Sequence, residues 1–520
     1  MKRRSMKHML HAGAVMALAL PAGVLAQPSP DTLVIAQSVD IESMEPNMLN
    51  QAVSINVHSH MFGTLLSVTP EGEVVPHFAE SYAWNDAGTE ISFTIREGLT
   101  CEDGEVLDAE DVAYTLNRAA DPDNKFIGHT PGFVFNSIGF VSARAEGPRT
   151  AVMTLKGYSS TVPGMAAKIF IHCKDSYEAL SNEEAVLKTV ASGPYKLVEW
   201  VKDDRVVLTR NPNYTLSEPA FDTVIWRVIP EASTRGVELV AGNVDIAVNI
   251  PPDQSAAINA YDTAQVVSVA GTRRMFVGFN FSGAFDGTPG GDAIKDVKVR
   301  QALNMAVDVP TICVQLLGTE CTRANGPANV GNPDIEAYPY DPDAAEKILD
   351  EAGWPRGADG TRFSLVMQGP NGRYLNDGQV QQAVAQYLSD IGVATTNDLM
   401  TMALFSPMAR EHTAGPVFFI GQGGATWSSV YDMSLFPTRE APVNNGMWFN
   451  EGWQSRWDSL KTIRDPAEEK RVVNEMLEIF HEDAPWIFLY FQPDFYGVSS
   501  RINWQPRRDE AIEAWTATLK

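Results

Sequence analysis

The stretch from Ser192 to Ile250 most constrains what this chain can fold into, because it joins several short elements with clear boundaries. Gly193-Pro194 marks a turn before the first element, since glycine tolerates positive φ and proline fixes its own. Pro230 stops the third element, a run rich in Val, Ile and Trp, and Gly242 ends a short helix. The order of strand, strand, strand, helix and strand is predicted for Tyr195–Val198, Val206–Arg210, Phe221–Ile229, Glu231–Ala241 and Val244–Ile250. This order is typical of a mixed α/β domain.

The same stretch is similar to a known protein family. Its segments SGPY, RNPNY, WRVIP and STRGVELVAGNVDIA, with their spacings, resemble the family 5 extracellular solute-binding proteins of ABC importers. That family includes dipeptide-, oligopeptide- and nickel-binding proteins. The resemblance implies a two-lobed, mixed α/β periplasmic binding protein fold of type II, in its large three-domain variant. It also implies that a solute is held between the lobes and trapped when the hinge closes.

Length and composition agree with a multidomain globular protein. At 520 residues the chain is too long for one hydrophobic core, so two or three domains are expected. A hydrophobic content of 44% with 20% charged residues is ordinary for a folded, water-exposed protein.

The first 26 residues have the pattern of a secretory signal peptide. A basic start with four Lys/Arg precedes the apolar run Gly13–Leu20, and Val24-Leu25-Ala26 predicts cleavage after Ala26. The apolar run is too short for a membrane span, and no later run reaches that length. No cysteine stands at the cut, so a lipid anchor is not expected. The sequence therefore predicts an exported, soluble protein of the periplasm.

The charge of the chain excludes some classes of partner. The formal net charge is −25, and removal of the leader, which carries four Lys/Arg and no acid, makes it four units more negative. A strongly acidic protein does not suit nucleic acid or anionic lipid. We interpret the charge as a solubility feature and not as the signature of a cationic ligand.

The four cysteines would lie in an oxidising compartment, where two disulfides are possible. Cys313 and Cys321 are close in sequence and are expected to clip the loop after a helix. Cys101 stands where the family usually has a large apolar residue, so a buried thiol and a bridge to Cys173 both remain open. No pair has CxxC spacing, so redox or zinc chemistry is not predicted.

Two histidines are the strongest hint of a metal. His58 and His60 lie in the apolar segment Val57–Leu66, and residues two apart on a strand share a face. No third ligand follows nearby in sequence. We therefore favour ordinary hydrogen-bonded histidines over a metal pair.

The block from Pro76 to Asp121 resembles the family's second motif, with Cys101-Glu102 in place of the commoner aromatic–His pair. Glu90–Arg96 alternates apolar and polar residues, as a half-buried strand does. Asp108 is expected to cap a helix, and Asp111 adds acidic charge to its first turn. Capping explains these acids better than a catalytic role.

Later segments also resemble the family or have clear boundaries. In Asp341–Gly353 the aspartate caps a helix, Pro342 takes the first helical position and the glycine ends it. The other helices are predicted at Asp296–Val309, Gln379–Ile391 and Glu468–Phe480, and strands at Thr32–Ala36, Thr272–Phe281, Phe363–Gln368 and Asp483–Gln492. The last strand is expected to lead the chain back toward its first domain.

Catalytic signatures are missing from the sequence. It contains no GxSxG elbow, no HExxH, no P-loop and no dinucleotide fingerprint, so no enzyme activity and no cofactor are predicted. An exported hydrolase using acids such as Glu102 and Asp103 is the alternative of another class. Gly421–Gly424 lacks the Lys-Ser/Thr of a phosphate loop, and predicts a turn where backbone approaches a ligand or a neighbouring strand.

Arg373 is the main candidate for a solute contact. It follows the Phe363–Gln368 strand in a loop before a helix, with Tyr374 beside it. The resemblance implies that an arginine at similar spacing grips the ligand's carboxylate in the dipeptide-binding branch. A guanidinium suits that role because it donates two parallel hydrogen bonds to one carboxylate. The alternative is a solvated loop arginine.

The chain departs from the peptide-binding pattern at one position. Peptide binders of the family place an Asp after a Gly-Trp pair to hold the ligand's α-amino group, and here Ala425 falls at that position. Asp432 could substitute only with a shifted loop, and burying an ammonium without a carboxylate costs several kcal/mol. This argues against a solute with a free amino terminus. Trp427 and Tyr431 could stack on a ligand or pack in a core.

The predicted solute contacts are Arg373, Tyr374, Asn280, Phe281, Gln368, Gly424, Ala425, Trp427, Tyr431, Asp432 and Met44. Residues 27–64, 186–270 and 493–520 are expected to form domain I of one lobe, with 65–185 inserted as domain II, and 271–492 to form the other lobe. The expected function is capture of a peptide or peptide-like solute for an ABC permease, by a monomer. The alternative solute is an opine, a sugar conjugate or a metal chelate.

Overall fold

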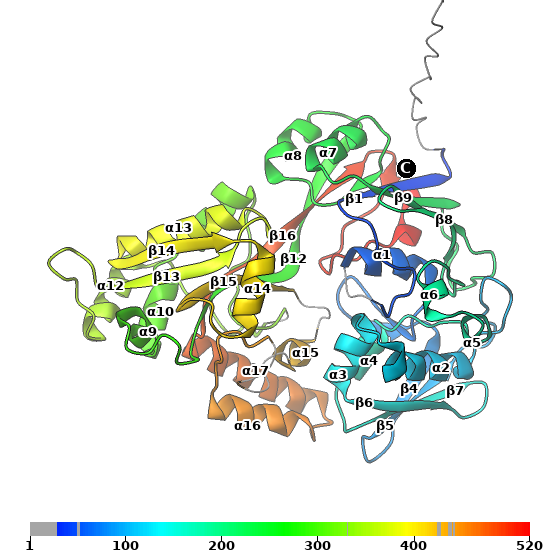
Figure 1. Cartoon of the computed structure of the whole chain (residues 1–520), viewed down its shortest axis with the longest axis horizontal. Helices are drawn as coiled ribbons and strands as arrows, with labels where there is room; N and C mark the ends of the chain where they lie inside the picture. The colour runs from blue at the N-terminus through cyan, green and yellow to red at the C-terminus, as the bar shows by residue number, and fades with distance from the viewer. Residues whose placement is uncertain (1–28, 49–51, 330, 424–427, 435–438, 440–442) are drawn as a thin grey trace, which may run out of the picture.

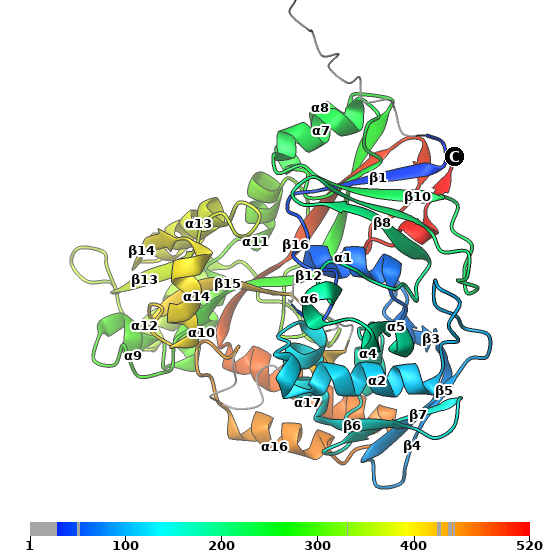
Figure 2. The same cartoon turned by 45° about the vertical axis from the view of Figure 1, so that its right-hand side comes forward.

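The computed structural model describes residues 29–48, 52–329, 331–423, 428–434, 439 and 443–520. The predicted signal peptide, residues 1–26, therefore lies outside the described residues. The chain forms a two-lobed, mixed α/β molecule with several sheets (Figures 1 and 2). No described helix combines the length and the apolar character that a membrane crossing requires.

One large mixed sheet runs through both lobes. Its strands lie in the order β14 (Val393–Met400), β13 (Phe363–Pro370), β15 (Val417–Gly423), β12 (Ala264–Phe279), β16 (Trp486–Ser499), β11 (Ile246–Ala247), β1 (Thr32–Gln37), β10 (Thr223–Val228), β9 (Arg205–Arg210) and β8 (Tyr195–Val201). The antiparallel strands β12 and β16 are the long central pair, and they connect the two ends of this sheet.

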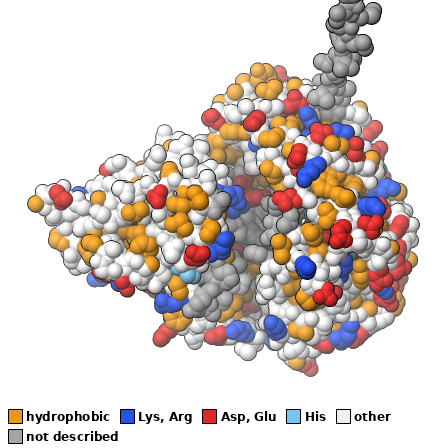
Figure 3. All heavy atoms as spheres, in the orientation of Figure 1, with side chains coloured by type: hydrophobic (Ala, Val, Ile, Leu, Met, Phe, Trp, Pro, Cys, Tyr) orange, Lys and Arg blue, Asp and Glu red, His pale blue; other side chains and the backbone are white. Residues whose placement is uncertain are grey.

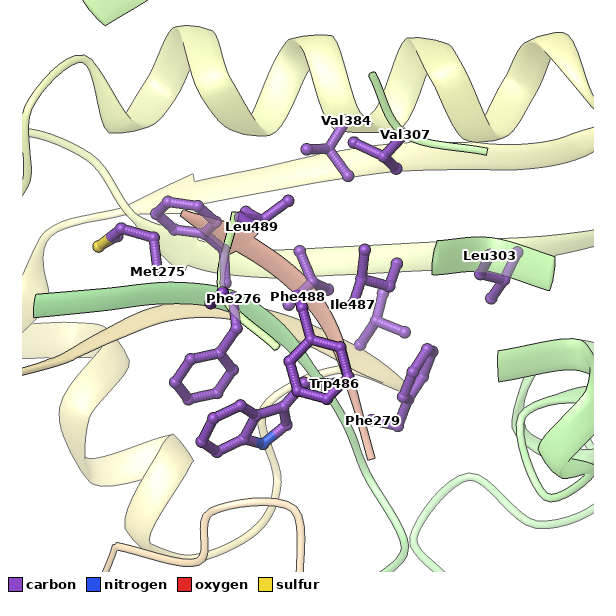
Figure 4. Close-up of a cluster of buried hydrophobic side chains, with 14 of the residues drawn as sticks. Met275, Phe276, Phe279, Leu303, Val307, Val384, Trp486, Ile487, Phe488 and Leu489 are labelled. Atoms are coloured by element: carbon purple, nitrogen blue, oxygen red, sulfur yellow. The ribbon is translucent and has the colours of Figure 1, made fainter. Parts of the chain in front are cut away.

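We call the elements that pack on the β13–β15 half the C-terminal lobe. Its core contains the second half of β12 and the first half of β16, where Phe276 stacks on Trp486 at 3.7 Å between ring centroids. Figure 4 shows these side chains between the strands and the covering helices. The helices of this lobe are α9 (Pro289–Ala293), α10 (Val297–Met305), α11 (Val309–Ile312), α12 (Pro342–Glu351), α13 (Asp377–Asp390), α14 (Met402–Arg410), α15 (Ser429–Ser434), α16 (Glu451–Leu460) and α17 (Pro466–Asp483).

The rest of the molecule is the N-terminal lobe, which contains the β1, β8–β11 half of the large sheet and a separate four-stranded sheet. The small sheet has the order β4 (Ala79–Trp84), β5 (Glu90–Ile95), β7 (Thr150–Leu155) and β6 (Phe140–Ala145). Its helices are α1 (Ala52–Met61), α2 (Ala109–Ala120), α3 (Phe135–Ile138), α4 (Val162–Ala166), α5 (Lys174–Glu178), α6 (Asn182–Ala185), α7 (Ala232–Val240) and α8 (Pro252–Asn259). Two short ribbons complete it: β2 (Leu66–Val68) with β3 (Val74–Pro76), and β17 (Ile502–Asn503) with β18 (Thr518–Leu519).

The structure confirms the helix caps that the sequence predicts. Asp108 caps α2, and Asp111 returns a hydrogen bond to the cap's backbone, which completes a capping box. Asp341 caps α12, with Pro342 in the first turn. Both disulfides form: Cys313 with Cys321, as predicted, and Cys101 with Cys173, which decides between the two alternatives.

Three predicted elements differ in the structure. The segment with His58 and His60 is the helix α1, so the two side chains do not share a face. The strand predicted at Val244–Ile250 pairs only over Ile246–Ala247, because Asn249 takes a left-handed φ of 53°. The strand predicted at Thr272–Phe281 is longer in the structure, where β12 begins at Ala264 and ends at Phe279. The predicted division into domains stays a prediction.

Candidate functional site

The two central strands lose their register where they pass between the lobes. Ala270 pairs with Pro493, but the next pair is Arg274 with Phe491, so residues 271–273 of β12 lie opposite the single residue Gln492. A bulge of this kind bends the strand and re-aims its side chains. At Gly271 a Cβ would lie 2.5 Å from Asp494 Oδ2, so this close approach requires glycine. We call this point the crossing.

Arg273 leaves the bulge toward the C-terminal segment of the N-terminal lobe. Its Nη2 lies 3.3 Å from Glu510 Oε1, and its guanidinium carbon lies 5.9 Å from the ring centroid of Tyr374. The Tyr374 hydroxyl donates to the carbonyl of Gly421, at 3.1 Å. The turn predicted at Gly421–Gly424 is wrong for residues 421–423, which lie in β15, while Gly424 lies outside the described residues. A Cβ on Gly421 would lie 2.5 Å from the sulfur of Met275, so the predicted close approach of the backbone is confirmed here for a neighbouring strand.

Arg373, the residue before Tyr374, also lies beside the Tyr374 ring. Its guanidinium carbon lies 5.2 Å from the Tyr374 centroid, while its side chain is exposed. Among the described residues the Arg373 guanidinium has no ion pair. The structure thus brings the predicted pair Arg373 and Tyr374 together with Arg273 at the crossing.

The loop that carries Arg373 is fixed by a buried carboxylate. Asp377, at the start of α13, accepts hydrogen bonds from the backbone N–H groups of Gly372, Arg373 and Tyr374, at 2.8, 2.8 and 2.9 Å. Three charge-assisted bonds from consecutive residues hold the backbone in one shape. Arg373 is therefore an exposed side chain on a loop whose backbone is held in place, which lowers the entropic cost of recognising an anion.

Asp432 lies in a second charged cluster, with Arg274 and Asn329, between the lobes. We call this cluster the seam. Asp432 Oδ2 lies 3.2 Å from Arg274 Nη1 and accepts a hydrogen bond from the backbone N–H of Asn329, at 2.7 Å. Arg274 Nη1 also donates to Asn329 Oδ1, at 2.6 Å. Both charged side chains are fully buried. Among the residues that the structure describes, the Nε and Nη2 edge of the guanidinium and Asp432 Oδ1 have no hydrogen-bond partner.

The surroundings of Asp432 affect its protonation. Burial raises its pKa above the ordinary value, and the charge of Arg274 with the Asn329 bond opposes that rise only in part. The preceding residue, Tyr431, packs into the core cluster of the small-sheet region of the opposite lobe. Helix α15, which carries both residues, therefore contacts both lobes.

One further acid lies at the crossing. Asp494 on β16 is buried, and within the described part of the chain its Oδ2 has no hydrogen-bond partner. Burial raises its pKa to about 7, the charge of Glu510 adds to this, and Arg273 opposes it. Sequence reasoning missed Arg273, Arg274 and Asp494, because their meeting depends on the bulge.

Several predicted solute contacts have other partners in the structure. Asn280 donates to the carbonyls of His412 and Ala414, and Gln368 binds Gly415 N and Asp398, so both brace the turn before β15. Phe281 lies under Arg300, at 5.1 Å, and Met44 is fully buried in the core of the N-terminal lobe. The predicted solute contacts of these residues stay predictions. Gly424, Ala425 and Trp427 lie outside the described residues.

The histidines form no metal pair. His58 Nε2 bonds the carbonyl of Ser43, at 2.8 Å, and His60 Nδ1 bonds that of Asn56, at 2.7 Å, so the hydrogen-bonded interpretation is confirmed. Burial lowers the pKa of each to about 4. Among the described residues one group, Cys101 with Asp103 and Glu105, has metal-like spacing, but the Cys101 sulfur is bonded to Cys173.

Figure 3 shows a hollow between the lobes, with Lys and Arg side chains along the margin of the C-terminal lobe. This placement agrees with a solute site at the crossing, between the rigid loop of Arg373 and the segment that carries Glu510. Solute sites commonly lie in such interdomain hollows.

Comparison with known proteins gives a consistent result. The chain is 24% identical over 490 residues to the glutathione-binding protein GsiB of Salmonella paratyphi A, covering 91% of each chain. The ABC transporter substrate-binding protein CtaP of Listeria monocytogenes has the same fold, with a TM-score of 0.82, 20% identity and coverage of 94% of this chain and 99% of that one.

A third relative was solved with a bound peptide. It is the periplasmic binding protein DppA of Helicobacter pylori in complex with the peptide STSA, with a TM-score of 0.73, 20% identity and coverage of 94% and 98%. The model of the bacterial extracellular solute-binding proteins, family 5 Middle, matches residues 73–440. The chain therefore belongs to the family 5 bacterial extracellular solute-binding proteins.

Proposed function

We propose that this chain is the solute-capturing component of an ABC importer, and that it binds a carboxylated, peptide-like solute between its lobes. The family, the relative that binds glutathione and the relative solved with a peptide support the solute class. The protein is exported by residues 1–26, acts in the periplasm as a monomer and hands the solute to a membrane permease. It makes and breaks no bond in the solute.

The observation that carries this proposal is the unpaired guanidinium of Arg373. It extends from a loop that Asp377 holds rigid, next to the crossing of the two lobes, and has no ion partner among the described residues. A bidentate hydrogen bond to a solute carboxylate would give the Arg373 guanidinium its ion partner. Tyr374 would contribute the apolar wall beside that carboxylate, since its ring lies against two guanidinium groups.

The crossing would also act as the hinge. In this proposal residues 27–64, 186–270 and 493–520 form domain I, 65–185 domain II and 271–492 the other lobe. The strands β12 and β16 then change lobe within the bulge, where a few residues can absorb the change in backbone angles.

The proposal is tested by isothermal titration calorimetry of the mature protein with glutathione and with a set of dipeptides and tripeptides. We expect saturable binding of at least one of these, and at least a tenfold loss of affinity in Arg373→Gln. Arg410→Gln, at an exposed arginine of α14, is the matched control and should keep wild-type affinity. Failure of every peptide, together with recovery of a non-peptide solute from the native protein by mass spectrometry, would contradict the peptide-like class.

A further inference from the structure

Three of the acidic groups at the crossing and the seam already have partners within the chain. Asp432 pairs with Arg274, Glu510 pairs with Arg273, and Asp377 accepts from consecutive backbone N–H groups. Each of these carboxylates has therefore a cation or a set of donors from the chain itself. Among the described residues of this site, the charge without a partner is the positive charge of Arg373.

The pairing at Asp432 is the decisive one, because it is an ion pair in the interior of the protein. Both side chains are fully buried, and Oδ2 is held by Arg274 and by the Asn329 backbone at once. An ammonium from a solute would have to displace Arg274 or to bind in addition to it. Displacement would leave a guanidinium buried without its counterion, which is strongly unfavourable. Addition would place two cations on one carboxylate.

The atoms of this pair that lack a partner also favour a carboxylate of the solute over an ammonium. No described residue binds the Nε and Nη2 edge of Arg274, and this edge can donate two parallel hydrogen bonds to a carboxylate. The pair has one acceptor that no described residue binds, Asp432 Oδ1. A buried polar group without a partner costs free energy until something satisfies it. The cluster therefore favours acceptor groups of a solute over donor groups.

Asp494 is the remaining candidate for binding an ammonium. It keeps a free Oδ2, but it is buried beside Glu510, and its pKa of about 7 leaves a large fraction neutral at neutral pH. A neutral carboxyl group donates its own proton and does not balance an ammonium. Its oxygen also lies against the bulge, within reach of the position that a Cβ of Gly271 would take.

We infer that the internal pairing of Asp432 with Arg274 makes this chain select solutes that carry a carboxylate and no free ammonium group, such as amino-blocked peptides. Arg274 takes the position, relative to Asp432, that an ammonium of the solute would otherwise take. This inference rests on the proposed function, because it names the charge of the solute that the same site would bind.

The first test uses the solute that the protein carries from its own periplasm. The solute is released by denaturation. One portion is treated with an amine-reactive reagent and another with a carboxyl-esterifying reagent, and the mass of each product is measured by mass spectrometry. We expect esterification without amine labelling. A peptide that reacts with the amine reagent would overturn the inference and leave the proposed function standing. A carboxylated compound with neither an amine nor a peptide bond would support the inference and contradict the peptide-like class.

The second test compares matched ligands by calorimetry: a dipeptide, its N-acetyl form and its C-terminal amide. For the wild type we expect the N-acetyl form to bind at least tenfold more tightly than the free form, and the amide to bind weakly. In Arg274→Met the ratio should shift at least tenfold toward the free form, because Asp432 is released. Arg274→Lys keeps a cation and should keep the wild-type preference.

The ratio of two ligands within one variant does not depend on how much of that variant is folded. A shift in Asp494→Asn instead of Arg274→Met would overturn the assignment to Asp432. Equal or tighter binding of the free dipeptide by the wild type would overturn the inference as well. If neither form binds the wild type while a non-peptide carboxylate does, the peptide-like part of the proposed function fails.

Discussion

Two of the buried arginine–carboxylate pairs among the described residues differ in how completely they are satisfied. In the N-terminal lobe, Glu45 binds Arg118 at 2.8 Å and accepts from the backbone of Asn47 at 2.9 Å, while Arg118 also binds Asn182 and lies over a phenylalanine ring. At the seam, Asp432 and Arg274 both keep atoms that no described residue binds.

The two carboxylates shift in opposite directions as a result. Burial tends to raise the pKa of both. At Glu45 the interactions with His172, Arg118 and the Asn47 N–H overcome burial and lower the pKa to about 2. At Asp432 burial prevails. Equal burial thus gives opposite shifts, and the number of partners decides which one. The first pair is complete within the chain, whereas the second has capacity left for a further group.

Breaking the complete pair should have the largest effect. Arg118→Met leaves Glu45 charged and buried, so we expect the free energy of unfolding to fall by about 3–5 kcal/mol. Urea denaturation measures it. Arg149→Met, which removes an arginine from its exposed ion pairs with Glu80 and Glu97, should cost no more than about 1 kcal/mol. Similar losses in the two variants would mean that burial of the Glu45 pair is unimportant.

The pH dependence of stability should have opposite signs at the two carboxylates. The lowered pKa of Glu45 contributes stability that is present above pH 4.5 and is lost as the pH falls toward about 2, by roughly 3 kcal/mol. The raised pKa of Asp432 means that the folded state binds the proton more tightly, so stability is lost as the pH rises above 3.8.

Urea denaturation at several pH values separates these two effects. The deficit of Glu45→Gln relative to wild type should grow as the pH rises from 2 to 4.5, whereas that of Asp432→Asn should shrink as the pH rises above 3.8. Deficits that change in the same direction would refute the comparison.

Replacing both charged partners of a pair by neutral residues should lower the free energy of unfolding by different amounts for the two pairs. Arg274→Met/Asp432→Asn keeps an acceptor for the Asn329 N–H, and we expect it to cost about 1 kcal/mol or less, since buried ion pairs are often replaceable. Each double variant loses one arginine–asparagine bond, but Arg118→Met/Glu45→Gln should cost more, because it also loses the contact of Arg118 with a phenylalanine ring. A larger loss at the seam than in the N-terminal lobe would show that the seam pair is needed for folding.

The smallest effect on stability is expected at the unpaired arginine. Arg373 is exposed and lacks an ion partner, so Arg373→Gln should change the free energy of unfolding by less than about 0.5 kcal/mol. Its affinity for a carboxylated solute should nevertheless fall at least tenfold. Thermal unfolding with and without solute measures both, and a destabilised apo protein would assign Arg373 a structural role.

Local rules in the sequence predicted much of the fold. Asp108 and Asp341 cap their helices because capping depends on neighbours within one turn. The segment with His58 and His60 was misjudged because its apolar residues suit a strand as well as a buried helix. The pairing of Arg274 with Asp432 has no local signal, since it depends on a bulge and on a helix far along the chain. Arg373 was found through resemblance and not through its spacing.

The shared strands also affect how the molecule comes apart. Because β12 and β16 each extend from one lobe into the other, the sheet has no internal edge at the crossing. A lobe expressed alone would carry half-strands whose backbone donors and acceptors lack partners, and such edges promote aggregation. Calorimetry of the intact chain should accordingly show one heat-absorption peak, and sensors built on this protein should place their fluorophores at surface positions of an uncut chain.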